Sequence, residues 1–314
     1  MDRNLLKYNH ISVATKKALR YIDSRRTGEV KPMKTRWNKL NSLIDGGIEW
    51  GNFYTLAGIS GSGKSAFTNI LETDLFDLNK PLNKPFNVLS FNFEMSAYRQ
   101  ILRKLSAKIQ KTVSELKNNP SSNGVLLTDD DLKRIKKEAY EIEKYNIYYV
   151  DIPGSVSQIG NTIINFSQSH PDSNILVILD HARLAKRIIT GQGEQQMLDS
   201  LGATLLEVIK RIPERCSVIL LSQLNREIEK RISYPNEHYP IRSDLFGADS
   251  IYQYSDYVFV THRPEILGIR LYGPERLPTD GKIFLHILKN RDGEVKIIMM
   301  ENNLKYNSIE ETPY

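Results

Sequence analysis

The chain has little cysteine and no long apolar run. Its 314 residues include one cysteine, Cys216, which excludes an internal disulfide and a metal site built from several cysteines. Cys216 lies in an apolar stretch, so we expect it to be a small buried hydrophobic residue. No apolar segment reaches the roughly 18 to 20 residues of a membrane helix, and the first residues do not form a signal peptide. We expect a soluble cytoplasmic protein without a membrane partner.

Acidic side chains are fewer than basic ones. The chain has 43 lysines and arginines against 37 aspartates and glutamates, a net charge of +6. This balance is compatible with a polyanionic partner, although many basic proteins bind no nucleic acid. Internal repeats and low-complexity tracts are also lacking. The length and composition therefore fit a single α/β core with additions.

Residues 58–65 (GISGSGKS) match the phosphate-binding pattern GxxxxGK[ST] at every fixed position. An apolar strand over 53–57 precedes them and a helix follows, which is the order that this loop requires. The backbone N–H groups of such a loop surround a phosphate, the lysine reaches the β- and γ-phosphates, and the final hydroxyl binds Mg²⁺. The segment predicts an ATP and Mg²⁺ site formed by Gly58, Ser60, Gly61, Ser62, Gly63, Lys64, Ser65 and Ala66.

Helices and strands alternate after this loop, which indicates a mostly parallel, twisted sheet covered by helices on both faces. The expected strands cover 86–93, 147–150, 174–180 and 217–222, and the expected helices cover 95–117, 129–145, 155–169 and 198–212. The helix over 95–117 carries a run of basic residues that predicts a solvated face, namely Arg99, Arg103, Lys104, Lys108 and Lys111.

Asp180 ends a continuous apolar run over 174–180, the pattern of a central strand buried on both faces. In a phosphate-loop ATPase an acid at this point holds Mg²⁺ together with the loop hydroxyl, here Ser65. We assign Asp180 to the metal. The alternative is a strand-end aspartate that caps the next turn.

The segments that flank the expected core, residues 36–302, have different characters. Residues 1–35 contain an amphipathic helix that begins near Ile11 and ends near Thr27, and this helix packs either on its own domain or on a neighbouring subunit. Within the core, 262–281 has too many glycines and prolines for a helix or strand interior and predicts an ordered surface loop. Residues 303–314 are expected to be a tail, either a flexible end or a partner-binding peptide.

Several segments, taken in order, resemble the ATPase domain of DnaB-type replicative helicases over residues 37 to 300: GISGSGKSAF, FNFEMSA, a strand ending in LD, LLSQLNREIEKR, SDLFGADSIYQYSD and LKNRDG. The resemblance implies a RecA-like core and a ring of six subunits around single-stranded DNA. It also implies docking of the N-terminal helix on a neighbour.

The same resemblance implies roles for four residues at strand ends. Glu94 would be the general base that polarises the attacking water, and Gln223 would sense the γ-phosphate. Lys289 and Arg291 would reach the nucleotide of the adjacent subunit, with Arg291 as an arginine finger. The alternative for these two cations is a solvated hairpin end, since Asp292 and Gly293 follow them as turn residues.

Three departures from the family pattern are visible. Relatives have an N-terminal domain that recruits primase, so the 35 residues here predict a stand-alone form with a separate primase or loader, from a phage or mobile element in a bacterial cytoplasm. Phe246 stands where the family usually has an arginine, and an aromatic ring can stack on a base but cannot neutralise a phosphate. His181 is interpreted as a structural neighbour. The candidate DNA contacts are therefore Lys186, Arg187, Arg226, Lys230, Arg231, Arg242 and Phe246, in loops at the carboxyl ends of strands.

The sequence thus predicts an ATP-dependent, ring-forming DNA helicase that translocates on single-stranded DNA. Two alternatives stay open: a RecA-like DNA-dependent ATPase that forms filaments without unwinding, and a nucleotide-gated assembly or loading scaffold. Glu94, Lys289 and Arg291 argue against the scaffold, which needs no catalytic groups. Phe246 and the short N-terminal segment keep it open.

Overall fold

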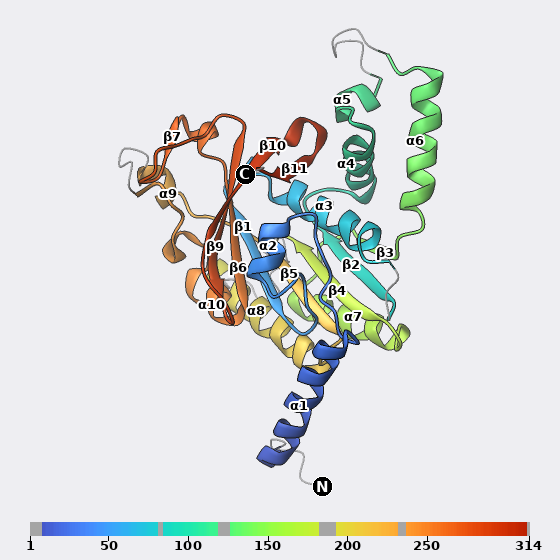
Figure 1. Ribbon diagram of the computed structural model, residues 1–314, viewed down its shortest axis with the longest axis vertical. Coiled ribbons are helices and arrows are strands. Elements are labelled where there is room, and N and C mark those ends of the chain that lie inside the picture. The colour runs from blue at the N-terminus through green and yellow to red at the C-terminus, as the bar shows by residue number, and fades with distance from the viewer. Residues whose placement is uncertain (1–7, 81–83, 119–125, 182–192, 232–236, 313–314) are drawn as a thin grey trace.

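A nine-stranded sheet forms the centre of the computed structural model, which describes residues 8–80, 84–118, 126–181, 193–231 and 237–312. The strand order is β11-β10-β9-β6-β1-β5-β4-β2-β3, and the six strands from β6 to β3 run parallel. Strands β9, β10 and β11 extend the sheet in antiparallel fashion. The predicted α/β architecture with a mostly parallel, twisted sheet is confirmed (Figure 1).

The bounds of the strands agree closely with the alternation in the sequence. They are β1 Phe53–Gly58, β2 Phe86–Asn92, β3 Ile147–Val150, β4 Asn174–Asp180, β5 Cys216–Gln223, β6 Tyr257–His262, β9 Lys282–Asn290, β10 Ile297–Asn303 and β11 Ser308–Glu311. The helices are α1 Ile11–Thr27, α2 Asn38–Leu43, α3 Lys64–Asp77, α4 Ala97–Ile109, α5 Val113–Leu116, α6 Asp129–Ile142, α7 Val156–Ser169, α8 Glu194–Arg211, α9 Glu227–Lys230 and α10 Ala248–Tyr254.

Helices cover both faces of the sheet, so each central strand contributes to two cores. In β4, Leu176 and Ile178 point into the core beneath α3, while Val177 points into the core beneath α7 and α8. Successive side chains of a strand alternate between faces, and a strand covered on both sides is therefore apolar throughout. This explains the uninterrupted run that precedes Asp180, and Cys216 is likewise buried in β5.

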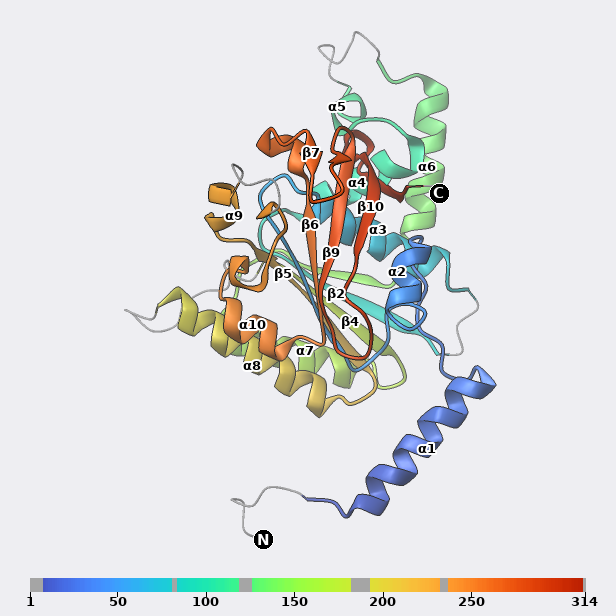
Figure 2. The same ribbon diagram turned by 60° about the vertical axis from the view of Figure 1, so that its left-hand side comes forward.

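Helix α1 extends away from the body of the protein in both views (Figures 1 and 2). It ends where the sequence predicts, because Gly28 adopts a left-handed φ of 74° and its N–H caps the carbonyl of Arg25. None of its side chains is buried by the described residues, and Ile11 and Leu19 are 74% and 61% exposed. The monomer thus leaves the apolar positions of α1 in solvent.

The helix predicted over 95–117 is wrong in its continuity and in its solvated face. Gln110 takes a φ of 56° and ends α4, and Thr112 then starts the short α5 through a capping box with Glu115. Lys104 is 2% exposed rather than solvated, and Arg103 is partly buried. The basic run therefore divides between the protein interior and its surface.

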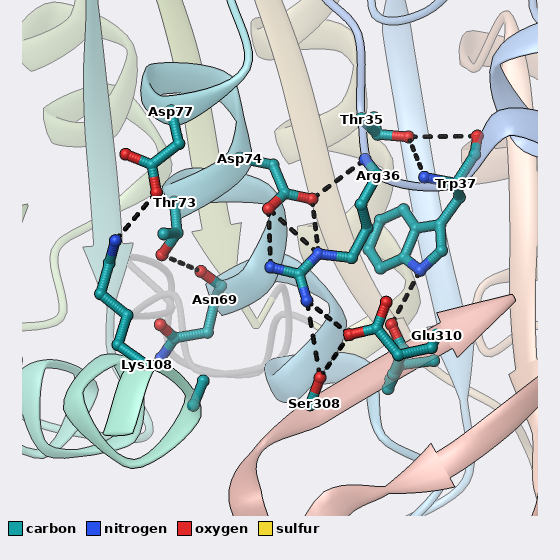
Figure 3. A network of polar contacts seen from close by, with 12 residues as sticks. Thr35, Arg36, Trp37, Asn69, Thr73, Asp74, Asp77, Lys108, Ser308 and Glu310 are labelled. Carbon is teal, nitrogen blue, oxygen red and sulfur yellow. Dashed lines mark hydrogen bonds and ion pairs between the residues drawn. The ribbon is translucent and has the colours of Figure 1, made fainter. Parts of the chain in front are cut away.

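The expectation of a flexible end after Asn302 is wrong for the residues that the structure describes there. Strand β11 pairs with β10, Ile309 is buried, and the carbonyl of Ile309 accepts a hydrogen bond from Trp37 Nε1 at 3.0 Å. Figure 3 shows Arg36 between α3 and β11, where it donates to Asp74 and to Glu310. The last strand is thereby tied to the helix that follows the phosphate loop.

Residues 262–281 are ordered, as predicted, but they contain a 3₁₀ turn, η5 (Pro264–Leu267), and a hairpin of β7 (Leu271–Tyr272) and β8 (Leu277–Pro278). The hairpin covers a buried cluster in which Tyr272 Oη contacts His286 Nε2 at 2.9 Å. Both ring nitrogens of His262 lack a hydrogen-bond partner within the described ranges. Burial lowers the pKa of His262 to about 4 and lowers that of His286 as well.

We predict that acid destabilises this protein through His262. Between pH 6.5 and 4 the unfolded chain binds a proton that the folded histidine does not, so the free energy of unfolding falls as pH falls. For one such buried histidine, the free energy of unfolding falls by about 2 kcal/mol between pH 7 and pH 5. Urea unfolding at both pH values should show a smaller difference for His262→Phe, while the exposed control His10→Phe should keep it. Equal pH dependence in wild type and His262→Phe would contradict this assignment.

Candidate active site

The predicted phosphate loop, residues 58–65, connects β1 to α3 at the carboxyl edge of the sheet. Gly61 and Gly63 adopt φ values of 77° and 98°, which L-residues with side chains rarely adopt. Lys64 Nζ lies across the loop and donates to the carbonyls of Gly58 and Ile59 at 2.7 and 3.0 Å. Burial lowers the pKa of Lys64, and the nearby acids Asp180 and Glu94 oppose this shift. The loop is therefore folded around a cation in a partly dehydrated setting.

Among the other predicted loop residues, Ser60 is exposed and Ala66 is buried in α3. Ser62 is fully buried, and its Oγ lies 3.0 Å from Thr261 Oγ1 on β6. A Cβ atom at Gly58 would lie 2.6 Å from the carbonyl oxygen of Thr261. The end of β6 thus packs directly against the loop, a contact for which the sequence gives no local signal.

Asp180 and Ser65 meet as the sequence predicts, with Ser65 Oγ donating to Asp180 Oδ2 at 3.3 Å. Burial raises the pKa of Asp180 to about 6, and the charge of Glu94 adds to this effect. A buried carboxylate beside another carboxylate gains from a nearby cation. Mg²⁺ is typically bound through a hydroxyl or one or two carboxylates together with phosphates and water, so this donor set fits the ion. Ser65 and Asp180 would hold it.

Glu94 and Gln223 lie at the ends of β2 and β5, and His181 lies between them. His181 Nε2 is 3.7 Å from Glu94 Oε2 and 3.4 Å from Gln223 Nε2. The Glu94 side chain is 56% exposed, whereas that of His181 is 9% exposed. Glu94 is therefore accessible to solvent, and it is near enough for its charge to act on Lys64 and Asp180. His181, interpreted from the sequence as a structural neighbour, thus lies between the acid and the amide.

Arg103 is a further site residue that the sequence reasoning overlooked. It projects from α4, and its pKa is lowered by burial while the charges of Asp180 and Glu94 counteract that shift. A guanidinium near both acids on this side of the loop can bind a phosphate oxygen. Arg103 is partly buried because α4 packs against α3, and it lines the same hollow as Lys104 and Asn69.

A buried polar network fixes the strand of Glu94 relative to the loop helix. Lys104 Nζ donates to Glu72 Oε2 at 2.6 Å and to Asn69 Oδ1 at 2.7 Å, both on α3. Glu72 Oε1 accepts from Ser90 Oγ on β2 at 2.8 Å. Removal of one partner from such a buried pair leaves an uncompensated charge and is strongly destabilising. The network therefore holds α3, α4 and β2 in one arrangement.

Lys289 and Arg291 lie at the opposite end of the sheet from their own phosphate loop. Strand β9 is antiparallel to β6, and the register pairs Asn290 with Tyr257 and Tyr257 with Tyr54, near the start of β1. At about 3.3 Å per residue the loop begins on the order of 15 Å away. Strand β9 ends at Asn290, so Arg291 lies one residue past the strand.

Contacts within the chain hold both cations. Arg291 Nε lies 3.1 Å from Asp256 Oδ1, and Asp256 Oδ2 accepts a hydrogen bond from the backbone N–H of Phe53 at 2.8 Å. Lys289 Nζ donates to the carbonyl oxygen of Tyr252 at 2.7 Å. These contacts hold both cations at the sheet end away from their own phosphate loop.

Some of the predicted DNA contacts are exposed, whereas others are held by contacts within the chain. Arg226, Lys230 and Arg242 are exposed near the carboxyl ends of the strands. Arg231 instead donates to both carboxylate oxygens of the buried Asp244, and Phe246 packs against the core beneath α8. Because it forms this ion pair, Arg231 stabilises the segment around Asp244 and is not available to bind a DNA phosphate. Lys186 and Arg187 lie outside the described residues.

A phosphate loop at the carboxyl edge of a mostly parallel sheet, with an acid at the end of the strand beside it, defines a P-loop ATPase domain of the RecA-like type. Comparison with known families narrows this class. The chain matches the DnaB-like helicase C-terminal domain family over residues 32–311. It belongs to that family, and it is an ATP hydrolase of the helicase type.

Solved structures share the fold. A solved ATPase domain is 19% identical and superposes with a TM-score of 0.81, over 98% of this chain and 100% of that chain. A DnaB-like replicative helicase, described with its interactions with primase, is 18% identical with a TM-score of 0.78, over 98% of this chain and 68% of its own. No curated protein sequence matches the chain. None of the described helices is long and apolar enough to cross a membrane.

We predict that Thr261 supports nucleotide binding through Ser62. Thr261→Val leaves the buried Ser62 hydroxyl without the partner that it has on β6, at a cost of about 1 kcal/mol or more. The Kd for ATP, measured by calorimetry, should rise roughly fivefold. Thr261→Ser keeps the hydroxyl and should bind ATP with nearly wild-type affinity. Wild-type affinity in Thr261→Val would show that the loop does not depend on β6.

Proposed function

We propose that this chain is a replicative DNA helicase that assembles as a ring, because the topology of one subunit does not bring all the proposed catalytic groups to its own phosphate loop. The observation that carries the proposal is the location of Lys289 and Arg291 at the sheet end opposite their own phosphate loop. Cations that stabilise a transferring phosphoryl group must lie beside it. In a ring, the end of β9 in one subunit can face the loop of the next, and each site is then completed at a boundary.

Within one subunit, the proposed roles follow the geometry of the site. Lys64 and Ser65 hold the phosphates, and Asp180 with Ser65 holds the metal, which supplies charge neutralisation to the phosphates when it is bound. Glu94, exposed at the end of β2, orients the attacking water as general base. Gln223 senses the γ-phosphate, and its contact with His181 links it to Glu94. Arg291 arrives from the neighbour as the finger.

Helix α1 supports the proposed assembly. Its residues Ile11, Leu19 and Ile22 are 74%, 61% and 60% exposed within the described residues, and an amphipathic helix gains stability when its apolar positions are buried. We assign the burial of these positions to a neighbouring subunit in a ring of six. In a closed ring of identical subunits, one surface of each subunit packs against a different surface of the next subunit, and this contact is repeated around the ring.

The proposed DNA contacts are the exposed cations Arg226, Lys230 and Arg242, which carry the positive charge that a phosphate backbone requires. A backbone-tracking motor needs no base preference. A separate primase or loader is the proposed partner, and the site of action is the cytoplasm of a bacterium or a phage-infected host.

The test is ATP hydrolysis with and without oligo-dT, in the presence of a forked duplex that reports strand separation by fluorescence. We predict stimulation by DNA and ATP-dependent separation, with both lost in Glu94→Gln because water is no longer activated. Glu94→Gln should still bind ATP, whereas Lys64→Ala should not.

Other outcomes discriminate among the functions. Stimulation without separation would indicate the filament-forming ATPase. Hydrolysis that is slow and indifferent to DNA would contradict the helicase and indicate the assembly scaffold.

A further inference from the structure

Tyr252 on α10 contacts both the proposed DNA-binding loop and the strand of the proposed catalytic cations. The 3₁₀ turn η4 (Arg242–Asp244) precedes α10 by three residues, so the loop and the helix form one continuous segment. Helix α10 lies beside the end of β9 that carries Lys289 (Figure 1). The Tyr252 side chain is partly buried.

Two cations share the ring of Tyr252. Arg242 Cζ lies 4.7 Å from the ring centroid, and Lys289 Nζ lies 5.0 Å from it. The face of an aromatic ring attracts a cation, so each contact is favourable by itself. The two cations repel each other, and the charges of Arg291 and Arg242 add to burial in lowering the pKa of Lys289. The ring therefore offsets part of the repulsion between these two charges.

Tyr252 also joins α10 to β9 through polar contacts. Its Oη donates to the carbonyl oxygen of Leu288 at 3.2 Å, and its own carbonyl oxygen accepts from Lys289 Nζ at 2.7 Å. Ring, hydroxyl and carbonyl of one residue thus all meet two successive residues of β9. A shift of the η4 segment must displace these contacts or carry the end of β9 with it.

We propose that Tyr252 is a positioning residue that holds Lys289 within its own subunit until DNA moves the η4 segment. The proposal rests on the proposed function, since it assigns Arg242 to DNA and Lys289 to a neighbour's nucleotide. Lys289 Nζ cannot keep its contacts with Tyr252 while it lies against a phosphate of the adjacent subunit. A DNA phosphate that draws Arg242 outward withdraws Tyr252 from β9, and Lys289 is released. DNA binding and ATP hydrolysis are thereby coupled.

Removal of the ring should weaken the hold on Lys289 without DNA, while the backbone carbonyl oxygen at position 252 can still accept its hydrogen bond. In Tyr252→Leu we expect the DNA-free ATPase rate to rise roughly two- to fivefold, and the ratio of DNA-stimulated to DNA-free rate to fall by a similar factor. Tyr252→Phe keeps the ring and should lie closer to wild type in both quantities. Gln253→Ala is the matched control: it changes an exposed side chain on the same helix but keeps the backbone carbonyl that also accepts from Lys289 Nζ at 3.4 Å, so both rates should stay unchanged.

A double-mutant cycle tests the link with Arg242. Arg242→Gln should lower the stimulation ratio in the wild-type background and should have a much smaller effect in Tyr252→Leu, because the path to Lys289 is already interrupted. Destabilisation of the fold alone would lower both the DNA-free and the DNA-stimulated ATPase rates. A raised DNA-free rate in Tyr252→Leu therefore cannot result from loss of folded protein. Tyr252→Met, which keeps most of the side-chain volume, replaces Tyr252→Leu if the latter melts below the assay temperature.

The outcomes separate the two proposals. A wild type that oligo-dT does not stimulate would contradict the proposed function itself. A stimulated wild type with the same DNA-free rate and the same ratio in Tyr252→Leu would overturn the role of Tyr252 and leave the helicase proposal intact. Additive effects of Arg242→Gln and Tyr252→Leu would equally overturn it, since independent residues do not couple.

Discussion

The antiparallel pairing of β9 with β6 is the constraint on which the account of function depends. It carries the chain back across the sheet, so Arg291 lies beside Asp256 and the start of β1, while the phosphate loop lies at the other end. A cation at that distance cannot stabilise charge on its own subunit's nucleotide. If Arg291 acts in catalysis, as proposed, it must therefore act on the nucleotide of a second copy of the chain, and the proposed assembly follows from the topology of the sheet.

Packing around the loop would position the phosphates for such a proposed shared site. The buried pair of Lys104 and Glu72 fixes α3 against α4 and β2, and Thr261 supports the loop from β6. A neighbour's cation can act only if the phosphates that it meets are held in a constant place. The same sheet also joins the loop to β9. The contacts of Ser62 at the loop and those of Tyr252 at the far end of β9 are therefore linked through one set of paired strands.

The sequence predicted the parts of the fold and site that depend on local patterns. The loop over 58–65, the buried strand before Asp180 and the end of α1 at Gly28 each have a signature within a few residues, and their positions in the structure agree. The roles of Glu94, Gln223, Lys289 and Arg291 came from a resemblance and stay predictions.

The parts that the sequence did not predict depend on long-range contacts. The burial of Lys104 is decided by Glu72, which lies 32 residues earlier, and no local pattern reports that pairing. Strand β11 has four residues, two of them glutamates, and it forms because Arg36 and Trp37 supply partners from the other end of the chain.

The proposal that Arg291 acts on the nucleotide of a neighbouring subunit is tested most directly by mixing two variants, Glu94→Gln and Arg291→Ala, each expected to be inactive alone. If Glu94 and Arg291 act across a boundary, about a quarter of the boundaries in an equal random mixture are intact, and ATP hydrolysis recovers accordingly. No recovery, in mixed rings verified by native mass spectrometry, would contradict the account.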